Sequence, residues 1–187
     1  GRATTKDENG NVVDLGGLFE YGEDKREFGA ADLGNGVVLR KTIVAEGIQD
    51  VGENAFKGAK YLKEITFSDK TQTIGDHAFD DCKVLEKVNL PATVNKMGKS
   101  PFRGCDILAE VNFNENPQFV CEEALIFETG ENGKKLVEYL SGKKPHIVEP
   151  SDLEGVTEIY EEAFMGSNIE SADLSGSRIP TVPVSAF

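Results

Sequence analysis

The sequence predicts a repeat solenoid of short β-strands and short helical or 3₁₀ turns, with a period of 23 residues. A six-residue motif recurs that starts on an apolar residue, commonly followed by Gly, and usually closes on Ala-Phe. Its last residue is an anchor, and consecutive anchors lie 23 residues apart from Phe56 to Leu125 and again from Phe164 to Phe187. Only the step from Leu125 to Phe164 differs, at 39 residues. The copies are residues 51–56, 74–79, 97–102, 120–125, 159–164 and 182–187.

A second pattern, Leu-x-x-Ile-x-Phe, lies between the anchors and predicts one strand in each unit. Its last two apolar positions alternate with polar residues, as in a strand with one buried face. One unit cannot bury its own apolar face, so neighbouring units must stack and form a parallel sheet on one side of the coil. The pattern occurs at Leu62, Ile65 and Phe67; at Leu85, Val88 and Leu90; at Leu108, Val111 and Phe113; shifted at Ile169, Ala172 and Leu174; and partly at Leu39, Thr42 and Val44.

Two positions after each anchor, a small residue or Asp predicts a tight turn with a left-handed backbone, which Gly adopts freely and Asp tolerates. The following position admits only small side chains, so its cysteines are expected to be buried, free thiols. The first position holds Gly58, Asp81, Gly104 and Gly166, and the second holds Ala59, Cys82, Cys105 and Ser167.

The anchors themselves are expected to form one internal column. Stacked aromatic rings in neighbouring turns pack well face to face or edge to face. The column is expected to hold Phe56, Phe79, Phe102, Phe164 and Phe187, with Leu125 filling the gap.

From Leu85 to Cys105 the chain has the pattern Leu-x-x-Val-x-Leu-Pro-x-x-Val-x-x-Met-Gly-x-x-x-Phe-x-Gly-Cys. This pattern resembles the BspA-like (type 5) leucine-rich repeats of surface proteins from bacteria and some protozoan parasites. The resemblance covers about residues 37–187. It implies a leucine-rich-repeat right-handed coil with one parallel β-sheet face, and a place in a cell-surface or secreted, adhesin-like protein.

The long step and the two ends depart from the repeat. Two strand-like runs flank an Asn-Gly dipeptide, which predicts a β-hairpin insertion at about residues 126–147. Residues 1–36 are expected to be an N-terminal cap, with a remnant of an upstream segment or a degenerate repeat as alternatives. The chain stops at the anchor Phe187, so we expect it to continue past that residue or to bury this end against a second copy.

Composition excludes several classes of function. The formal net charge is −13, which disfavours binding to nucleic acid or to an anionic membrane surface. No apolar run approaches the roughly 20 residues needed to cross a bilayer. No leader segment is visible, and Gly1 has the character of a tag remnant that replaced one.

The reactive residues give no pattern typical of an enzyme. His77 occupies a variable polar position of the repeat, and His146 has no cysteine nearby at the spacing of a metal site. Cys121 replaces a repeat glycine and is expected to be structural. We therefore expect no catalytic residues, no metal and no cofactor.

The most plausible function from the sequence is non-catalytic protein binding, with a host or extracellular-matrix protein as the partner that the family resemblance implies. Glycan binding and a passive spacer in a larger surface protein are the alternatives, and end-to-end self-association is a further expectation. The candidate binding residues point outward from the predicted strands: Lys41, Ile43, Glu64, Thr66, Lys87, Asn89, Glu110, Asn112, Ser171 and Asp173.

Overall fold

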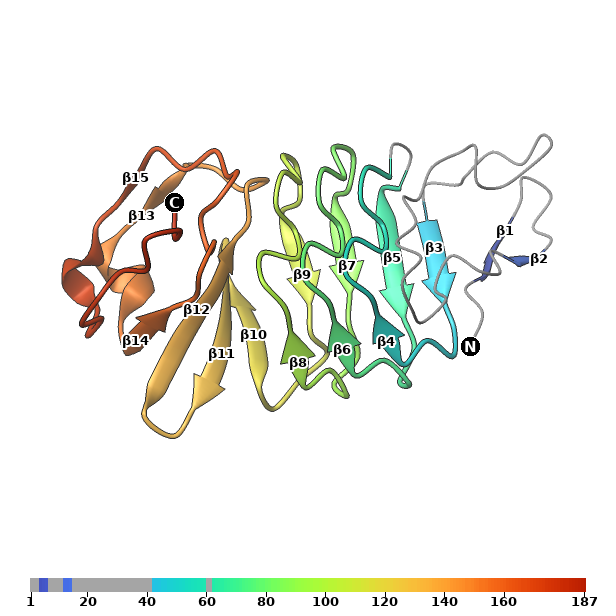
Figure 1. Ribbon diagram of the computed structural model, residues 1–187, viewed down its shortest axis with the longest axis horizontal. Helices are drawn as coiled ribbons and strands as arrows, with labels where there is room; N and C mark the ends of the chain where they lie inside the picture. Colours follow the sequence, from blue (N-terminus) through green and yellow to red (C-terminus); the bar gives the residue numbers. More distant parts are fainter. Residues whose placement is uncertain (1–3, 7–11, 15–41, 60–61) are drawn as a thin grey trace.

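The computed structural model describes residues 4–6, 12–14, 42–59 and 62–187, and over that range the chain is a β-solenoid (Figure 1). It has about six turns with the predicted period, and the only helices among the described residues are 3₁₀ turns. The predicted fold class is therefore confirmed. None of the helices in the described part of the chain is long and apolar enough to span a membrane.

The predicted strands form the main parallel sheet. Residues 23 apart lie side by side in it, so Ile65 is the partner of Val88, and Val88 is the partner of Val111. Two short N-terminal strands extend the sheet, because β1 pairs antiparallel with both β2 and β3. The sheet contains β2 (Val12–Asp14), β1 (Thr4–Lys6), β3 (Thr42–Ala45), β5 (Glu64–Phe67), β7 (Lys87–Asn89) and β9 (Glu110–Asn112) in that order. The other residues of segment 1–36 lie outside the described range, and its role as a cap stays a prediction.

A second parallel sheet, which the repeat pattern does not predict, forms where each repeat motif begins. Val51 pairs with Ile74, and Ile74 pairs with Met97, so every turn of this region contributes two strand segments. Only two residues of each turn take part, too few for the alternation of polar and apolar residues to be visible. The strands are β4 (Asp50–Val51), β6 (Thr73–Ile74) and β8 (Lys96–Met97).

A β-hairpin interrupts the coil after β9 and extends beyond its edge (Figure 1). Its strands β11 (Leu125–Gly130) and β12 (Gly133–Tyr139) are joined by a two-residue turn at Glu131-Asn132, one residue before the Asn-Gly dipeptide that predicts a tight turn. β10 (Phe119–Glu122) pairs with β11, and β14 (Val156–Ile159) pairs parallel with β12. The remaining elements are β13 (Ile147–Val148), β15 (Ser171–Ala172) and the 3₁₀ turns η2 (Pro150–Leu153) and η3 (Leu174–Gly176).

The hairpin divides the hydrophobic core into two clusters. Ile126 and Val137 pack in the cluster under β3 to β9, which we call the first block. Leu125, Phe127 and Leu136 pack in the cluster of the turns from β13 to Phe187, which we call the second block. Alternating residues of the hairpin thus contact opposite clusters. The hairpin is a wall between two cores and is apolar on both faces, as expected for strands buried on both sides.

The anchors confirm the predicted stacking in part. The rings of Phe56 and Phe79 stack with centroids 4.9 Å apart, and those of Phe79 and Phe102 stack at 5.4 Å. Phe164 and Phe187 stack at 4.6 Å, but Phe187 is 59% exposed, so its predicted burial is wrong.

Leu125 does not fill the gap in the column as predicted. It is buried, but it lies in β11 opposite Tyr139, and the ring of Tyr139 is the one that packs on Phe164, with centroids 6.0 Å apart. The motif copy that ends at Leu125 therefore leads into the hairpin, and Tyr139 has the anchor position of the interrupted turn.

The turns have the predicted backbone. Gly58, Asp81, Gly104 and Gly166 have φ values of 70°, 58°, 70° and 67°. The structure adds a second left-handed position inside the motif, two residues before the anchor. It holds Asn54, His77, Ser100, Glu123 and Glu162, with φ values of 57°, 53°, 38°, 53° and 65°.

Three buried polar side chains of the repeat are hydrogen-bonded across turns. Cys82 and Cys105 are buried, free thiols, as predicted, and their Sγ atoms donate to the carbonyls of Phe56 and Phe79 at 3.1 Å each. Thr71, which replaces an apolar residue of the repeat, is fully buried, and its hydroxyl donates to the carbonyl of Ile48 at 2.7 Å.

Candidate functional surface

Six of the predicted binding residues lie together on the outward face of the main sheet, which we call the strand face. They alternate with the buried residues Ile65, Val88 and Val111, so the alternation of the sequence places them on the solvent side. The strand face consists of Glu64 and Thr66 on β5, Lys87 and Asn89 on β7, and Glu110 and Asn112 on β9.

Contacts between neighbouring strands hold these side chains in register. The amide Nδ2 of Asn89 donates to Glu64 Oε1 at 3.1 Å and to Thr66 Oγ1 at 2.9 Å. Lys87 Nζ lies 3.2 Å from Glu110 Oε1. Exposed ion pairs of this kind contribute at most about 1 kcal/mol each, so they order the surface more than they stabilise the fold.

Two other predicted binding residues, Ser171 and Asp173, do not join this face. Ser171 lies in β15, and Asp173 is the N-cap of η3, where its carboxylate accepts from the Ser175 N–H at 2.9 Å. β15 pairs only with β13, in a separate two-stranded sheet of the second block. Lys41 is outside the described residues. The predicted outward position of Ile43 does not agree with the register of β3, because Ile43 is the partner of the buried Ile65, and Val44, which is 46% exposed, lies beside Thr66.

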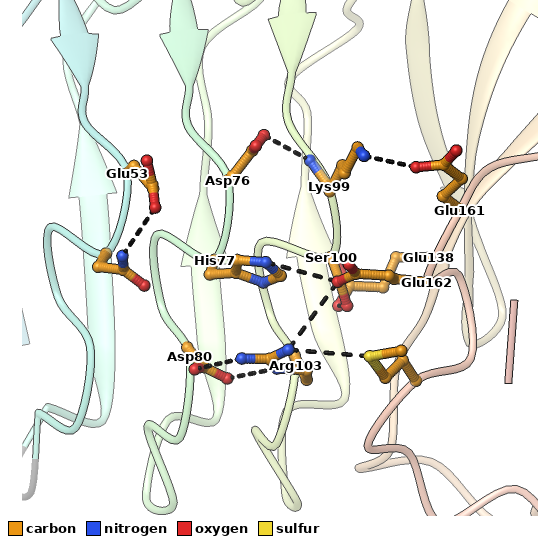
Figure 2. A network of polar contacts seen from close by, with 12 residues as sticks. Glu53, Asp76, His77, Asp80, Lys99, Ser100, Arg103, Glu138, Glu161 and Glu162 are labelled. Carbon is orange, nitrogen blue, oxygen red and sulfur yellow. Dashed lines mark hydrogen bonds and ion pairs between the residues drawn. The ribbon is translucent and has the colours of Figure 1, made fainter. Parts of the chain in front are cut away.

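A second row of polar residues, at the left-handed position of the motif, was not among the predicted binding residues. Figure 2 shows His77, Ser100 and Glu162 along this row, and Asn54 precedes them by one turn. His77 Nε2 lies 3.4 Å from Glu162 Oε2. A usable signal was present in the sequence, because Asn and His are among the residues that tolerate a left-handed backbone.

A buried ion pair lies beside that row. Arg103 donates from Nε to Asp80 Oδ1 at 2.9 Å and from an Nη atom to Oδ2 at 2.8 Å, and Lys57 Nζ lies 3.3 Å from Asp80 Oδ2. Burial alone would raise the pKa of Asp80. The hydrogen bonds and charges of Arg103 and Lys57 outweigh that effect and lower the pKa. Asp80 is therefore a carboxylate that ties three successive turns together.

The row continues directly from the first block to the second. Lys99 pairs with Glu161, and Arg103 contacts the sulfur of Met165 at 3.8 Å, each across 62 residues of sequence (Figure 2). These partners occupy equivalent repeat positions. The turn of Phe102 therefore faces the turn of Phe164, and we call this contact region the joint. The two turns meet because the motif copy between them, residues 120–125, is part of the β10–β11 strands and not of a regular turn.

Glu138 of β12 is buried inside the joint, with 2% of its surface exposed. Both of its oxygens lie 3.1 Å from the backbone N of Phe102, and Oε1 lies 3.1 Å from Ser100 Oγ. Burial raises the pKa of Glu138 to about 8, although the Phe102 N–H, the Ser100 hydroxyl and the Arg103 charge favour ionisation. No signal in the sequence indicates this residue, because it stands outside the repeat pattern.

The described residues contain no group of three or more His, Cys, Asp or Glu side chains placed to hold a metal ion. Burial raises the pKa of the Cys121 thiol to about 11, and that of Cys105 well above its ordinary value. Neither thiol has the low pKa of a reactive cysteine. His146 lies 3.3 Å from the hydroxyl of Tyr139 and 3.3 Å from Asn168 Nδ2.

The sequence profile of the BspA type leucine rich repeat region matches residues 35–130, in six copies. The chain belongs to the BspA-type leucine-rich repeat family. The match ends inside the hairpin, so the family pattern covers the first block and the first hairpin strand, β11. No curated protein matches the chain.

Solved structures match the chain at low sequence identity, and the first of the three below, with a TM-score above 0.5, shares the fold. A leucine-rich cell-surface protein from Faecalibacterium prausnitzii A2-165 matches 71% of this chain and 41% of its own, with 19% identity and a TM-score of 0.56. A leucine-rich repeat protein from Eubacterium ventriosum matches 72% of this chain and 48% of its own, with 14% identity and a TM-score of 0.48. The pneumococcal vaccine antigen PcpA matches 76% and 49%, with 16% identity and a TM-score of 0.41. The BspA-type chain thus spans less than half the length of each of these proteins.

Proposed function

We propose that this chain is a non-catalytic protein-binding module of a bacterial cell-surface or secreted protein, and that its strand face contacts the partner. The supporting observation is the ordered polar surface formed by Asn89, Glu64, Thr66, Lys87 and Glu110, whose contacts fix the side chains before any partner arrives. A pre-ordered surface loses little conformational entropy on binding. Membership of a family with a cell-surface relative supports the location.

The polar character of the strand face favours a protein over a glycan. The described strand-face residues on β5, β7 and β9 include no aromatic side chain. Sugar sites commonly use an exposed aromatic ring as a platform. The tyrosines that the sequence places near the solenoid surface are Tyr61, Tyr139 and Tyr160. Tyr61 lies outside the described residues, Tyr139 is buried, and Tyr160 is half-buried against the hairpin. Glycan binding is the second candidate function, and a passive spacer the third.

A pair of charge-swapped variants tests the strand face. Lys87→Glu with Glu110→Lys reverses both charges of this ion pair on the strand face and leaves the net charge unchanged. The matched control is Lys83→Asp with Asp106→Lys, which swaps another exposed pair between neighbouring turns, also 3.2 Å apart. Each protein would be immobilised and tested against a panel of extracellular-matrix proteins and a glycan array.

We expect binding to at least one matrix protein, weakened about tenfold or more by the strand-face swap, which corresponds to about 1.4 kcal/mol. The control swap should bind like the wild type. Equal weakening by both swaps would reject the strand face as the contact surface. Binding only on the glycan array would favour the second candidate, and no binding on either would favour the spacer.

A further inference from the structure

The backbone ladder along the anchors changes its acceptor at one place. In most turns the anchor N–H donates to the carbonyl of the residue before the next anchor. Phe56 donates to Ala78 at 2.7 Å, Phe79 to Pro101 at 2.8 Å, and Tyr139 to Ala163 at 2.8 Å. Phe102 is the exception among the described anchors with a following turn, because its N–H donates to the side chain of Glu138. A titratable group therefore stands where the repeat uses a fixed carbonyl.

This replacement lies at the joint between the two cores. Glu138 is in β12, between Val137 of the first core cluster and Tyr139 of the second. The next ladder bond, from Tyr139, already belongs to the second block. The bonds that Glu138 makes to Phe102 and Ser100 therefore link the first block to the wall that separates it from the second.

We propose that Glu138 is a proton-dependent latch: the neutral acid holds the Phe102 N–H and the Ser100 hydroxyl and closes the joint, and ionisation of this acid loosens it. A neutral carboxyl group suits the site, since its Oε1 can accept from the Phe102 N–H and the Ser100 hydroxyl without a buried charge. A carboxylate at this depth is desolvated and lacks a direct cationic partner among the described residues, which is a costly arrangement.

The charged and titratable groups around the latch come from three turns. Arg103 favours ionisation of Glu138, and Asp80, which is paired with Arg103, opposes it. The Cys105 thiol is also close enough for the Glu138 charge to raise its pKa. His77 and Glu162 lie along the same row and contact one another (Figure 2).

The direction of the pH effect follows from the raised pKa of Glu138. The pKa of Glu138 is about 8 in the folded chain, against an ordinary value of 4.5. Between these values the folded chain retains a proton that the unfolded chain releases. The contribution of Glu138 to stability is therefore complete below about pH 4.5 and is lost as the pH rises through about 8.

Amide hydrogen exchange at Phe102, followed by NMR and corrected for the intrinsic pH dependence of exchange, tests the latch. We expect protection of this amide to fall about tenfold between about pH 7 and pH 9 in the wild type. The amides of Phe56 and Phe79, which donate to carbonyls, should keep their protection. Unchanged protection of Phe102 across this range would overturn the proposal.

Two variants separate the latch from general effects of pH. Glu138→Gln keeps an acceptor and a donor in the same place without titrating, so protection of Phe102 should become independent of pH. The control Glu161→Gln removes an exposed acid at the same joint and should retain the wild-type profile. A wild-type profile in Glu138→Gln would overturn the proposal. If Glu138→Gln fails to fold, a carbon-13 NMR titration of Glu138 in the wild type decides: a midpoint near 8 supports the latch, and one near 4.5 overturns it.

Discussion

In the first block the anchor residues repeat one set of ring contacts, whereas in the second block the anchors differ in residue type and in burial. In the first block the rings of Phe56, Phe79 and Phe102 stack in register and lie at most 4% exposed. In the second block Tyr139 and Phe164 are buried, but the next anchor, Phe187, is largely exposed. The period alone therefore does not fix which residue anchors a turn, since Tyr139 packs on Phe164 although the 23-residue spacing marks Leu125.

The largest expected contrast is between two anchor truncations. Phe79→Ala removes a fully buried ring between two others and should lower the free energy of unfolding by about 3–5 kcal/mol. Phe187→Ala removes a ring that is mostly in solvent already, so the loss should be about 1 kcal/mol or less. Urea unfolding of both variants measures the difference. Equal losses of unfolding free energy would show that Phe79 and Phe187 are buried alike.

Tyr160 offers a second way to sharpen the comparison, at the contact between the hairpin and the second block. It stands where Gly52, Gly75 and Gly98 stand in the first block. Its hydroxyl donates to Glu128 in β11, and Lys135 Nζ lies 6.0 Å from its ring centroid. The departure from the repeat therefore joins the hairpin to the turn that comes after it.

Tyr160→Phe removes only the hydroxyl and should cost about 0.5–1.5 kcal/mol, the usual contribution of one hydrogen bond. Hydrogen exchange should quicken in β11 and not in β5 or β7. The burial that raises the pKa of Tyr160, together with Glu128, keeps the hydroxyl a donor at neutral pH. Faster exchange throughout the first block would contradict the division into two cores.

The smallest expected effect concerns Glu123, at the left-handed position of the motif copy 120–125. Glu123 has a φ of 53° there, and its side chain forms an exposed ion pair with Lys143. Glu123→Gly relieves the backbone strain and should stabilise the fold by up to about 1 kcal/mol. The control Glu122→Gly, in the extended strand β10, should destabilise it by a similar amount. Thermal unfolding distinguishes the two, and destabilisation by both would argue against strain at Glu123.

The sequence predicted the features that local spacing determines. The period, the strands at Leu-x-x-Ile-x-Phe, the left-handed turns at Gly58 and Asp81 and the buried thiols all depend on residues within one unit or its neighbour. It could not predict that Tyr139 takes the place of Leu125. Leu125 keeps the 23-residue spacing, and only pairing across the hairpin removes it from the column.

The candidate site was predicted to a similar extent. The alternation along each strand placed Glu64 to Asn112 on one face, but it assumed a continuous sheet and so included Ser171 and Asp173. Glu138 was missed for a physical reason. Its burial depends on the meeting of two turns 62 residues apart, and no local pattern distinguishes it from the exposed acids of this acidic chain.

The wall formed by the hairpin also affects how such a chain can change its length. Ile126 and Val137 pack in the first core cluster, and Phe127 and Leu136 pack in the second. The second block therefore packs on the hairpin whatever the number of turns in the first block. Whole turns can then be gained or lost before the turn of Phe79 without repacking the second block, because the turns of Phe79 and Phe102, which contact it directly, stay in place. A duplication in the first block would extend the strand face by one more row of outward side chains and leave the distal end of the molecule unchanged.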